Sequence, residues 1–125
     1  MLNVILVAVG GAIGSVARYL TGQFALRQFG PNFPWGTLAV NIVGSLAIGI
    51  FAELIARRFS APQEWRLFII TGFLGGFTTF SAFSLDVAAL ADRGDLFLAL
   101  AYIAASLLVS LFAVFAGLAL MRALL

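Results

Sequence analysis

The run from Thr71 to Ser84, TGFLGGFTTFSAFS, holds the residues of this chain that are best suited to binding ions. The glycines and threonines at 75–79 weaken a helix through backbone entropy or β-branching, which predicts a break there. Carbonyls freed by such a break can hold a hard cation of the Na⁺ type. Phe80 and Phe83, three residues apart, can present electropositive ring edges to a small anion. Phenylalanines at this spacing also serve as ordinary core or lipid contacts, so both interpretations stay open.

Two other hydrophobic segments each carry three polar side chains four residues apart, which places them on one helical face. They are Thr37, Asn41 and Ser45 in the earlier segment, and Tyr102, Ser106 and Ser110 in the later one. Amide and hydroxyl groups can donate hydrogen bonds to an anion without placing a full charge in the membrane, which suits transit. The alternatives are an asparagine that bonds a neighbouring helix and serines that bond their own helix.

Arg18 is the only charge well inside the first hydrophobic segment. It either snorkels to the membrane interface or attracts anions in a vestibule, a wide aqueous mouth of a pathway. Gly10 and Gly14 predict a close helix contact. A dinucleotide-binding turn is disfavoured, because these glycines lie within one continuous apolar span and Glu53, the next acid, is far away.

The elements that must position these residues are predicted by composition. With 63% hydrophobic and 10% charged residues in 125, the chain is too apolar for the surface of a soluble domain. A spanning helix needs roughly 20 apolar residues. We therefore predict an all-α membrane protein, a single transmembrane domain with four transmembrane helices. Their predicted bounds are about residues 2–26, 35–57, 64–90 with a break near 75–79, and 96–122.

Composition also excludes several functions. The sequence has no cysteine and no histidine, which removes disulfides, the usual zinc sites and Ser/His or Cys/His catalysis. We expect no enzyme activity. The sequence has seven arginines, no lysine and five acidic residues, and the arginines do not cluster into a basic stripe. Nucleic acid is therefore not an expected partner. The N-terminus lacks the basic start of a signal peptide, so we expect the first segment to be retained.

Four spans place both termini and the second connection on one side of the membrane. That side carries Arg57, Arg58, Arg66 and Arg122, and the other carries Arg18, Arg27 and Arg93. Four against three is a weak bias under the positive-inside rule. Either one helix end dominates insertion, or the chain inserts both ways and pairs antiparallel with a second copy. A bundle this small fills its own interior with side chains, so a pathway is expected between two subunits.

Over essentially its full length, the sequence closely resembles the Fluc family of fluoride channels, also called CrcB proteins. The resemblance rests on GGAIGSVARY, WGTLAVNIVGS and GFLGGFTTFSAFS in the first three segments and on the polar face of the fourth. It implies passive, selective fluoride export across the cytoplasmic (inner) membrane of a prokaryote. It also implies an antiparallel, dual-topology homodimer with two pathways, each built from both subunits.

The resemblance also implies roles for individual residues. Phe80 and Phe83 would be the anion-facing rings, and Asn41 would donate to fluoride near them. Backbone carbonyls of Gly75 and Thr78, from both subunits, would hold a structural Na⁺ at the dimer centre. The residues that would line or support the polar track are Ser106, Ser110, Tyr102, Thr37, Thr79 and Ser81.

Two positions depart from the family pattern. Asp86 stands where glutamate is frequent, with a shorter reach toward fluoride in the vestibule, and Ala82 stands where threonine is frequent. The alternative function is a proton-coupled small multidrug exporter of dual topology. Such an exporter needs a titratable carboxylate deep in the membrane, whereas Glu53 lies near a helix end and Asp86 toward one end of the third segment. A purely structural subunit would transport nothing.

Overall fold

The computed structural model describes residues 1–57 and 62–125, and the regular structure within these ranges is helical throughout. Four spans are long and apolar enough to cross a membrane: Leu2–Phe29 (α1), Trp35–Arg57 (α2), Gln63–Asp92 and Leu96–Leu124 (α6). The predicted all-α, four-span architecture is confirmed. The first helix continues three residues beyond its expected end at 26, because Gly30, with φ 81°, is the residue whose backbone leaves the helix. Arg58, used in the topology argument, lies outside the described residues.

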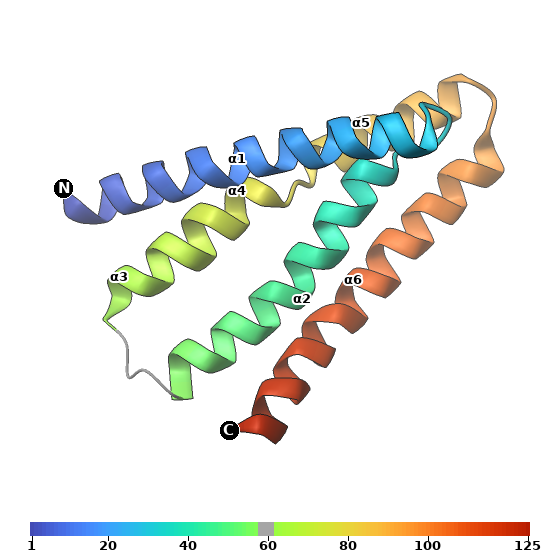
Figure 1. The fold of residues 1–125 in the computed structure, drawn as a ribbon. Coiled ribbons are helices and arrows are strands. Elements are labelled where there is room, and N and C mark those ends of the chain that lie inside the picture. The colour runs from blue at the N-terminus through green and yellow to red at the C-terminus, as the bar shows by residue number, and fades with distance from the viewer. Residues whose placement is uncertain (58–61) are drawn as a thin grey trace.

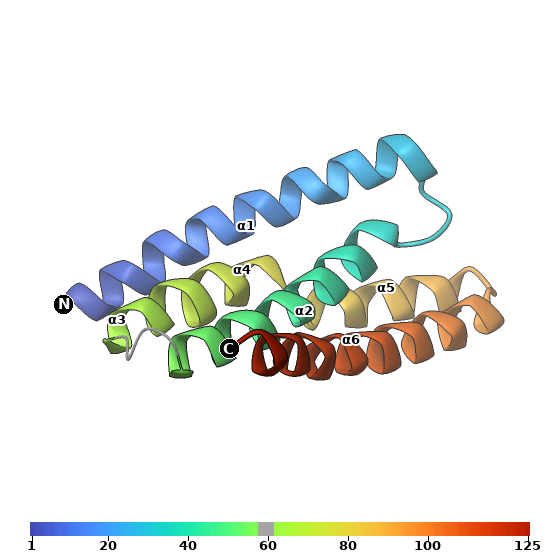
Figure 2. The ribbon, with the colours of Figure 1, turned by 60° about the horizontal axis from the view of Figure 1, so that its bottom comes forward.

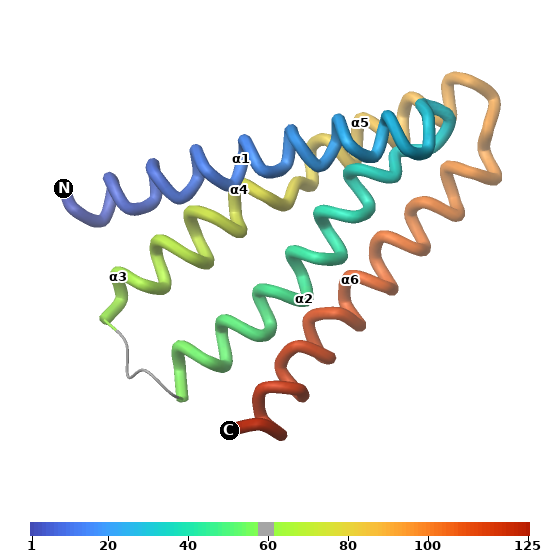
Figure 3. The backbone as a smooth tube through the Cα atoms, viewed as in Figure 1, coloured from blue at the N-terminus to red at the C-terminus, as the bar shows by residue number. Residues whose placement is uncertain are grey.

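The third span is not one regular helix. It consists of α3 (Gln63–Arg66), a π-helical stretch η1 (Leu67–Leu74), α4 (Gly75–Phe77) and α5 (Ser81–Asp92). Between α4 and α5 the chain loses its helical coil, and Thr78 is extended, with φ −88° and ψ 162° (Figure 3). The break falls at 78–80, so it overlaps the last two positions of the predicted window and extends one residue beyond it, because Gly75–Phe77 retains helical geometry.

The four spans form two packed pairs. Helix α2 packs along α6, and α1 packs against η1 and α4 (Figure 1). Both termini lie at the end of the bundle where α2 finishes, and the short connections after α1 and α5 lie at the opposite end (Figure 2). The break in the third span therefore lies near the middle of the bundle.

Glycines allow these close contacts. A Cβ atom at Gly10 would lie 2.6 Å from the carbonyl oxygen of Phe68, and one at Gly14 would overlap the carbonyl of Phe73. The predicted contact face of the first helix is confirmed, with η1 as its partner. Gly117 has the same role on α6, since a Cβ there would lie 2.5 Å from the carbonyl oxygen of Leu46 on α2.

A buried carboxylate ties α2 to α6 at the end that carries the termini. Glu53 is 8% exposed and pairs with Arg57 one turn later on α2. Its other oxygen lies 3.3 Å from Nε of Arg122 on α6. A buried charge is tolerated when it is paired in this way. The cluster fixes the register between the two helices.

Candidate functional site

One side chain forms hydrogen bonds with the backbone at the break in the third span. Asn41, in the first third of α2, donates from Nδ2 to the carbonyl oxygen of Thr79 at 2.9 Å. Its Oδ1 accepts from the backbone N–H of Thr79 at 2.8 Å. The asparagine thus replaces helical partners that Thr79 lacks at this non-helical position. One of the two N–H groups of the amide is used, which leaves the other for a further acceptor.

The break leaves the carbonyls of Gly75 and Thr78 without their usual helical donors. In a regular helix the N–H of Thr79 would bond the carbonyl of Gly75, but here it bonds Asn41. In the same way the N–H of Ala82 would bond the carbonyl of Thr78, but it bonds the hydroxyl of Thr79 at 3.1 Å. These are the two carbonyls to which the resemblance assigns Na⁺. The hydroxyl of Ser81, on the exposed side, lies 3.3 Å from that of Thr79.

Arg18 also belongs to the break. Its Nε donates to the carbonyl oxygen of Gly76 at 3.1 Å, in a partly buried position. Arg18 does not line the cavity at the end of the bundle that carries the short connections. The structure therefore gives this arginine a partner that neither the snorkelling nor the vestibule interpretation had named. The hydrogen bond between Arg18 and Gly76 fixes α1 to the broken segment.

A polar cavity of about 240 Å³ lies between α2, the break and α6. Its lining is Asn41, Ser45, Thr78, Thr79, Phe80, Phe83, Ser106, Leu107 and Ser110. The rings of Phe80 and Phe83 are 5.5 Å apart, and their exposed fractions are 72% and 8%. Among the described residues, the buried hydroxyls of Ser106 and Ser110 have no hydrogen-bond partner. Unpartnered donors in a polar cavity can bind an anion that passes through it.

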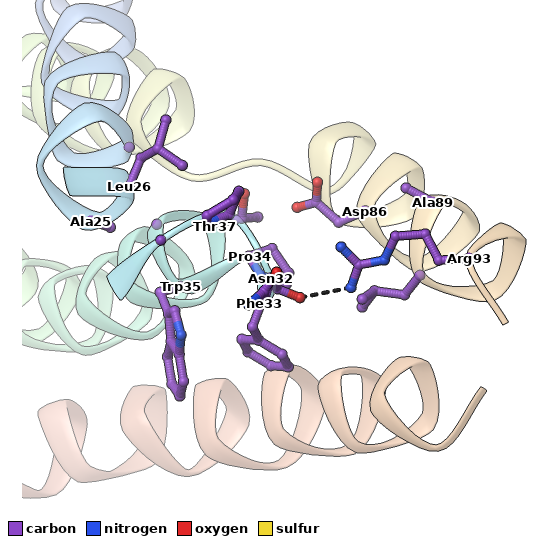
Figure 4. Close-up of a pocket in the computed structure, with 15 residues that line it drawn as sticks. Ala25, Leu26, Asn32, Phe33, Pro34, Trp35, Thr37, Asp86, Ala89 and Arg93 are labelled. Atoms are coloured by element: carbon purple, nitrogen blue, oxygen red, sulfur yellow. Dashed lines mark hydrogen bonds between the residues drawn. The ribbon is translucent and has the colours of Figure 1, made fainter. Parts of the chain in front are cut away.

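A second cavity, of about 300 Å³, lies at the end of the bundle that carries the short connections (Figure 4). We call it the vestibule. Thr37, Asp86 and Arg93 line it, together with the chain from Gly30 to Gly36. Nη2 of Arg93 donates to the carbonyl oxygen of Asn32 at 2.7 Å. Thr37 thus belongs to this cavity, one helical turn from Asn41 in the other.

Tyr102 separates the two cavities. It is fully buried, and its hydroxyl donates to the carboxylate of Asp86 at 3.1 Å. Its ring lies 5.1 Å from Phe83, which lines the polar cavity, and meets Phe33 of the vestibule edge-on at 5.4 Å. The shorter Asp86 therefore still reaches the polar face of α6.

The structure thus brings six of the nine residues assigned to the pathway into one cavity. They are Phe80, Phe83, Asn41, Thr79, Ser106 and Ser110. Of the lining residues to which the resemblance gave no role in the pathway, Ser45 had been placed on the polar face of the second segment by its four-residue spacing after Asn41. Leu107 has no such signal. The hydroxyl of Thr78 donates to the carbonyl of Leu74 at 2.9 Å, so its side chain completes the turn before the break.

Four membrane-spanning helices, a broken third span and a polar cavity beside the break define a small channel or transporter. The chain belongs to the family described as CrcB-like protein, Camphor Resistance (CrcB), whose model matches residues 5–118. A protein named fluoride-specific ion channel FluC from Rhizobium etli is 65% identical over 124 residues, 99% of each chain. Its namesake from Agrobacterium fabrum is 66% identical over 98% of each chain, and that from Mesorhizobium japonicum 54% over 99%. The family resemblance is confirmed.

Proposed function

We propose that this chain forms a fluoride-selective channel that lets fluoride leave the cell passively. Relatives named for that activity cover nearly the whole chain at 54–66% identity. The observation that carries the proposal is the polar cavity, where the Asn41 amide, two unpartnered serine hydroxyls and two phenyl rings meet. Because the relatives are bacterial, we place the protein in the cytoplasmic membrane of a prokaryote.

The chemistry of the cavity suits a small, strongly hydrated anion. The free N–H of Asn41 and the hydroxyls of Ser106 and Ser110 replace water donors as the ion leaves bulk solvent. The electropositive edges of Phe80 and Phe83 add attraction without a formal charge. Within residues 1–57 and 62–125 no arginine lines this cavity, so the anion meets no fixed positive charge there. Binding stays weak enough for release on the far side.

We further propose that two copies assemble antiparallel. The cavity at membrane depth holds the Asn41 amide and several hydroxyl groups, and Phe80, which lines it, is 72% exposed. In a single copy these polar groups would open toward lipid, which is unfavourable. A second copy packed over this face would enclose the cavity. The weak arginine bias agrees with a chain that inserts in both orientations. Each of the two pathways would then use residues from both copies.

The broken segment suits a structural Na⁺ at the centre of that dimer. Carbonyl oxygens are the ligands that unwound transporter helices offer to Na⁺. The carbonyls of Gly75 and Thr78 have lost their helical donors to side chains, as described above. Two copies would contribute both carbonyls each. The ion would act as a fixed charge that holds the two broken segments together and takes no part in transit.

The rival multidrug exporter is not favoured. It requires a carboxylate deep in the membrane that gains and loses a proton during transport. Glu53 is paired with two arginines at the end of the bundle, and Asp86 accepts a hydrogen bond from Tyr102 beside the vestibule. Proton-coupled uptake of a lipophilic cation that Asp86→Asn abolishes would support the exporter.

The decisive experiment is ion efflux from liposomes that contain the purified protein. Fluoride should leave rapidly once charge is compensated by a potassium ionophore, and chloride should be retained. Protein-free liposomes control for leakage of the neutral acid. Chloride efflux at the same rate as fluoride efflux, or no fluoride efflux, would overturn the proposal.

The antiparallel dimer has its own test. Since the sequence has no cysteine, Gln28→Cys introduces a single thiol at the end that carries the short connections. In intact cells, about half of the chains should react with a membrane-impermeant maleimide if both orientations occur. Labelling of all chains or of none would contradict dual topology. Sodium can be tested in parallel by exchange for a larger cation, which should weaken the dimer in detergent.

A further inference from the structure

The vestibule has an unfavourable charge balance for a channel that admits anions. Asp86 lines it, and Asp95 stands at its edge beside Arg93. Arg93 is the one cationic side chain among the described residues that line the vestibule. Without Arg93 the described residues that line the vestibule would include the Asp86 carboxylate and no cationic side chain.

The position of Arg93 is fixed by the turn between α5 and α6. Nη2 donates to the carbonyl of Asn32 at 2.7 Å and lies 3.1 Å from Oδ2 of Asp95. Gly94, with φ 83°, adopts the left-handed conformation that lets the chain reverse so that its two neighbours meet. Figure 4 shows the guanidinium of Arg93, from the end of α5, directed toward Asn32 in the connection after α1. It remains partly exposed, so its charge acts on ions in the vestibule.

We propose that Arg93 is an anion-steering residue, which offsets Asp86 and Asp95 and so sets the rate at which fluoride reaches the polar cavity. This inference rests on the proposed function. Charges at a mouth bounded by low-dielectric walls raise the local concentration of the opposite ion, and the effect is screened by salt. Arg93 acts before the anion is dehydrated. It therefore affects conduction at low fluoride and leaves the choice between fluoride and chloride unchanged.

The test is the fluoride current in planar bilayers at low fluoride and low ionic strength. Arg93→Gln should reduce it by about threefold to tenfold. The loss should largely disappear in roughly 1 M of an impermeant salt, where the Debye length is about 3 Å. Arg93→Lys keeps the charge and should retain most of the current. The fluoride-to-chloride ratio should be unchanged in both variants.

A compensating substitution separates charge from structure. Asp95→Asn removes one negative charge at the N-cap of α6, a position where asparagine and aspartate are equally suitable. It should raise the current at low salt, and combining it with Arg93→Gln should bring the current back toward that of the unmodified protein. Thermal unfolding in detergent identifies any variant that is merely misfolded.

The inference fails if Arg93→Gln leaves the low-salt current unchanged. It also fails if the current lost in Arg93→Gln is equally lost at high salt and in Arg93→Lys, because the hydrogen bond to Asn32 would then be what matters. If the unmodified protein conducts fluoride, either of these results leaves the proposed function intact. An unmodified protein that conducts no fluoride refutes the proposed function itself.

Discussion

Asn41 and the backbone of Thr79 hold each other through a reciprocal pair of hydrogen bonds, 2.9 Å and 2.8 Å long, across 38 positions of sequence. The same amide lines the polar cavity. Asn41 therefore both builds the break in the third span and contributes to the proposed pathway. The sequence left two alternatives for Asn41, a bond to a neighbouring helical segment and donation to an anion. One side chain can have both roles.

Asn41→Asp should abolish fluoride flux and also destabilise the protein. A carboxylate can accept from the Thr79 N–H but cannot donate to its carbonyl, and it repels the anion. Loss of that donor should lower the free energy of unfolding by about 1–3 kcal/mol. Liposome efflux and thermal unfolding measure the two effects. Asn3→Asp, at the exposed start of α1, is the matched control and should alter neither. Unaltered stability in Asn41→Asp would show that the paired bonds contribute little.

Phe80→Ile should eliminate most fluoride flux while the dimer survives in detergent. Isoleucine keeps much of the apolar bulk but lacks the electropositive ring edge. Phe97→Ile removes a ring that is 82% exposed and does not line the cavity, so it should conduct normally. Efflux rates and size-exclusion profiles of both variants give the comparison. Equal flux in the two variants would show that the Phe80 ring has no role in the pathway.

Ser106→Ala and Ser110→Ala should reduce flux without destabilising the protein. Neither hydroxyl has a hydrogen-bond partner among the described residues, so its removal breaks no internal bond and should not lower the unfolding free energy. Ser84→Ala is the control. Its hydroxyl already donates to the carbonyl of Phe80 on the protein exterior, and flux should be unchanged. A large loss of stability in Ser106→Ala would indicate a structural role for that hydroxyl.

Gly14→Ala should destabilise the bundle, whereas Gly22→Ala should not. A methyl group at Gly14 would overlap the backbone carbonyl of Phe73, which cannot move without shifting η1. A cost of about 1–3 kcal/mol is expected for such overpacking. At Gly22, on the same helix, a methyl group would have no neighbour within 4 Å in the described part of the chain, and alanine favours the helix. Chemical unfolding of the two variants is the measurement. Equal stability would contradict the close packing of α1 on η1.

Much of the fold could be predicted from the sequence because bilayer thickness and hydropathy constrain it strongly. The break was also predictable, since glycine and β-branched threonine at 75–79 oppose a helix. The residues that form hydrogen bonds with the backbone at the break could not be predicted. Arg18 and Gly76 are 58 positions apart, and their hydrogen bond depends on how α1 packs against α4. The π-helical winding of LFIITGFL was equally hidden, because a mainly apolar run carries no signature of it.

That winding gives the third span a local tolerance for its length. The η1 stretch, Leu67–Leu74, contains more residues per turn than an α-helix and so absorbs surplus chain between its two ends. Deleting one residue from a regular α-helix rotates everything downstream by roughly 100°. Deleting one residue from η1 would instead let the stretch rewind toward an α-helix, so that the carbonyls of Gly75 and Thr78 keep their neighbours. A deletion in η1 should therefore do less damage than a deletion in α2 or α6.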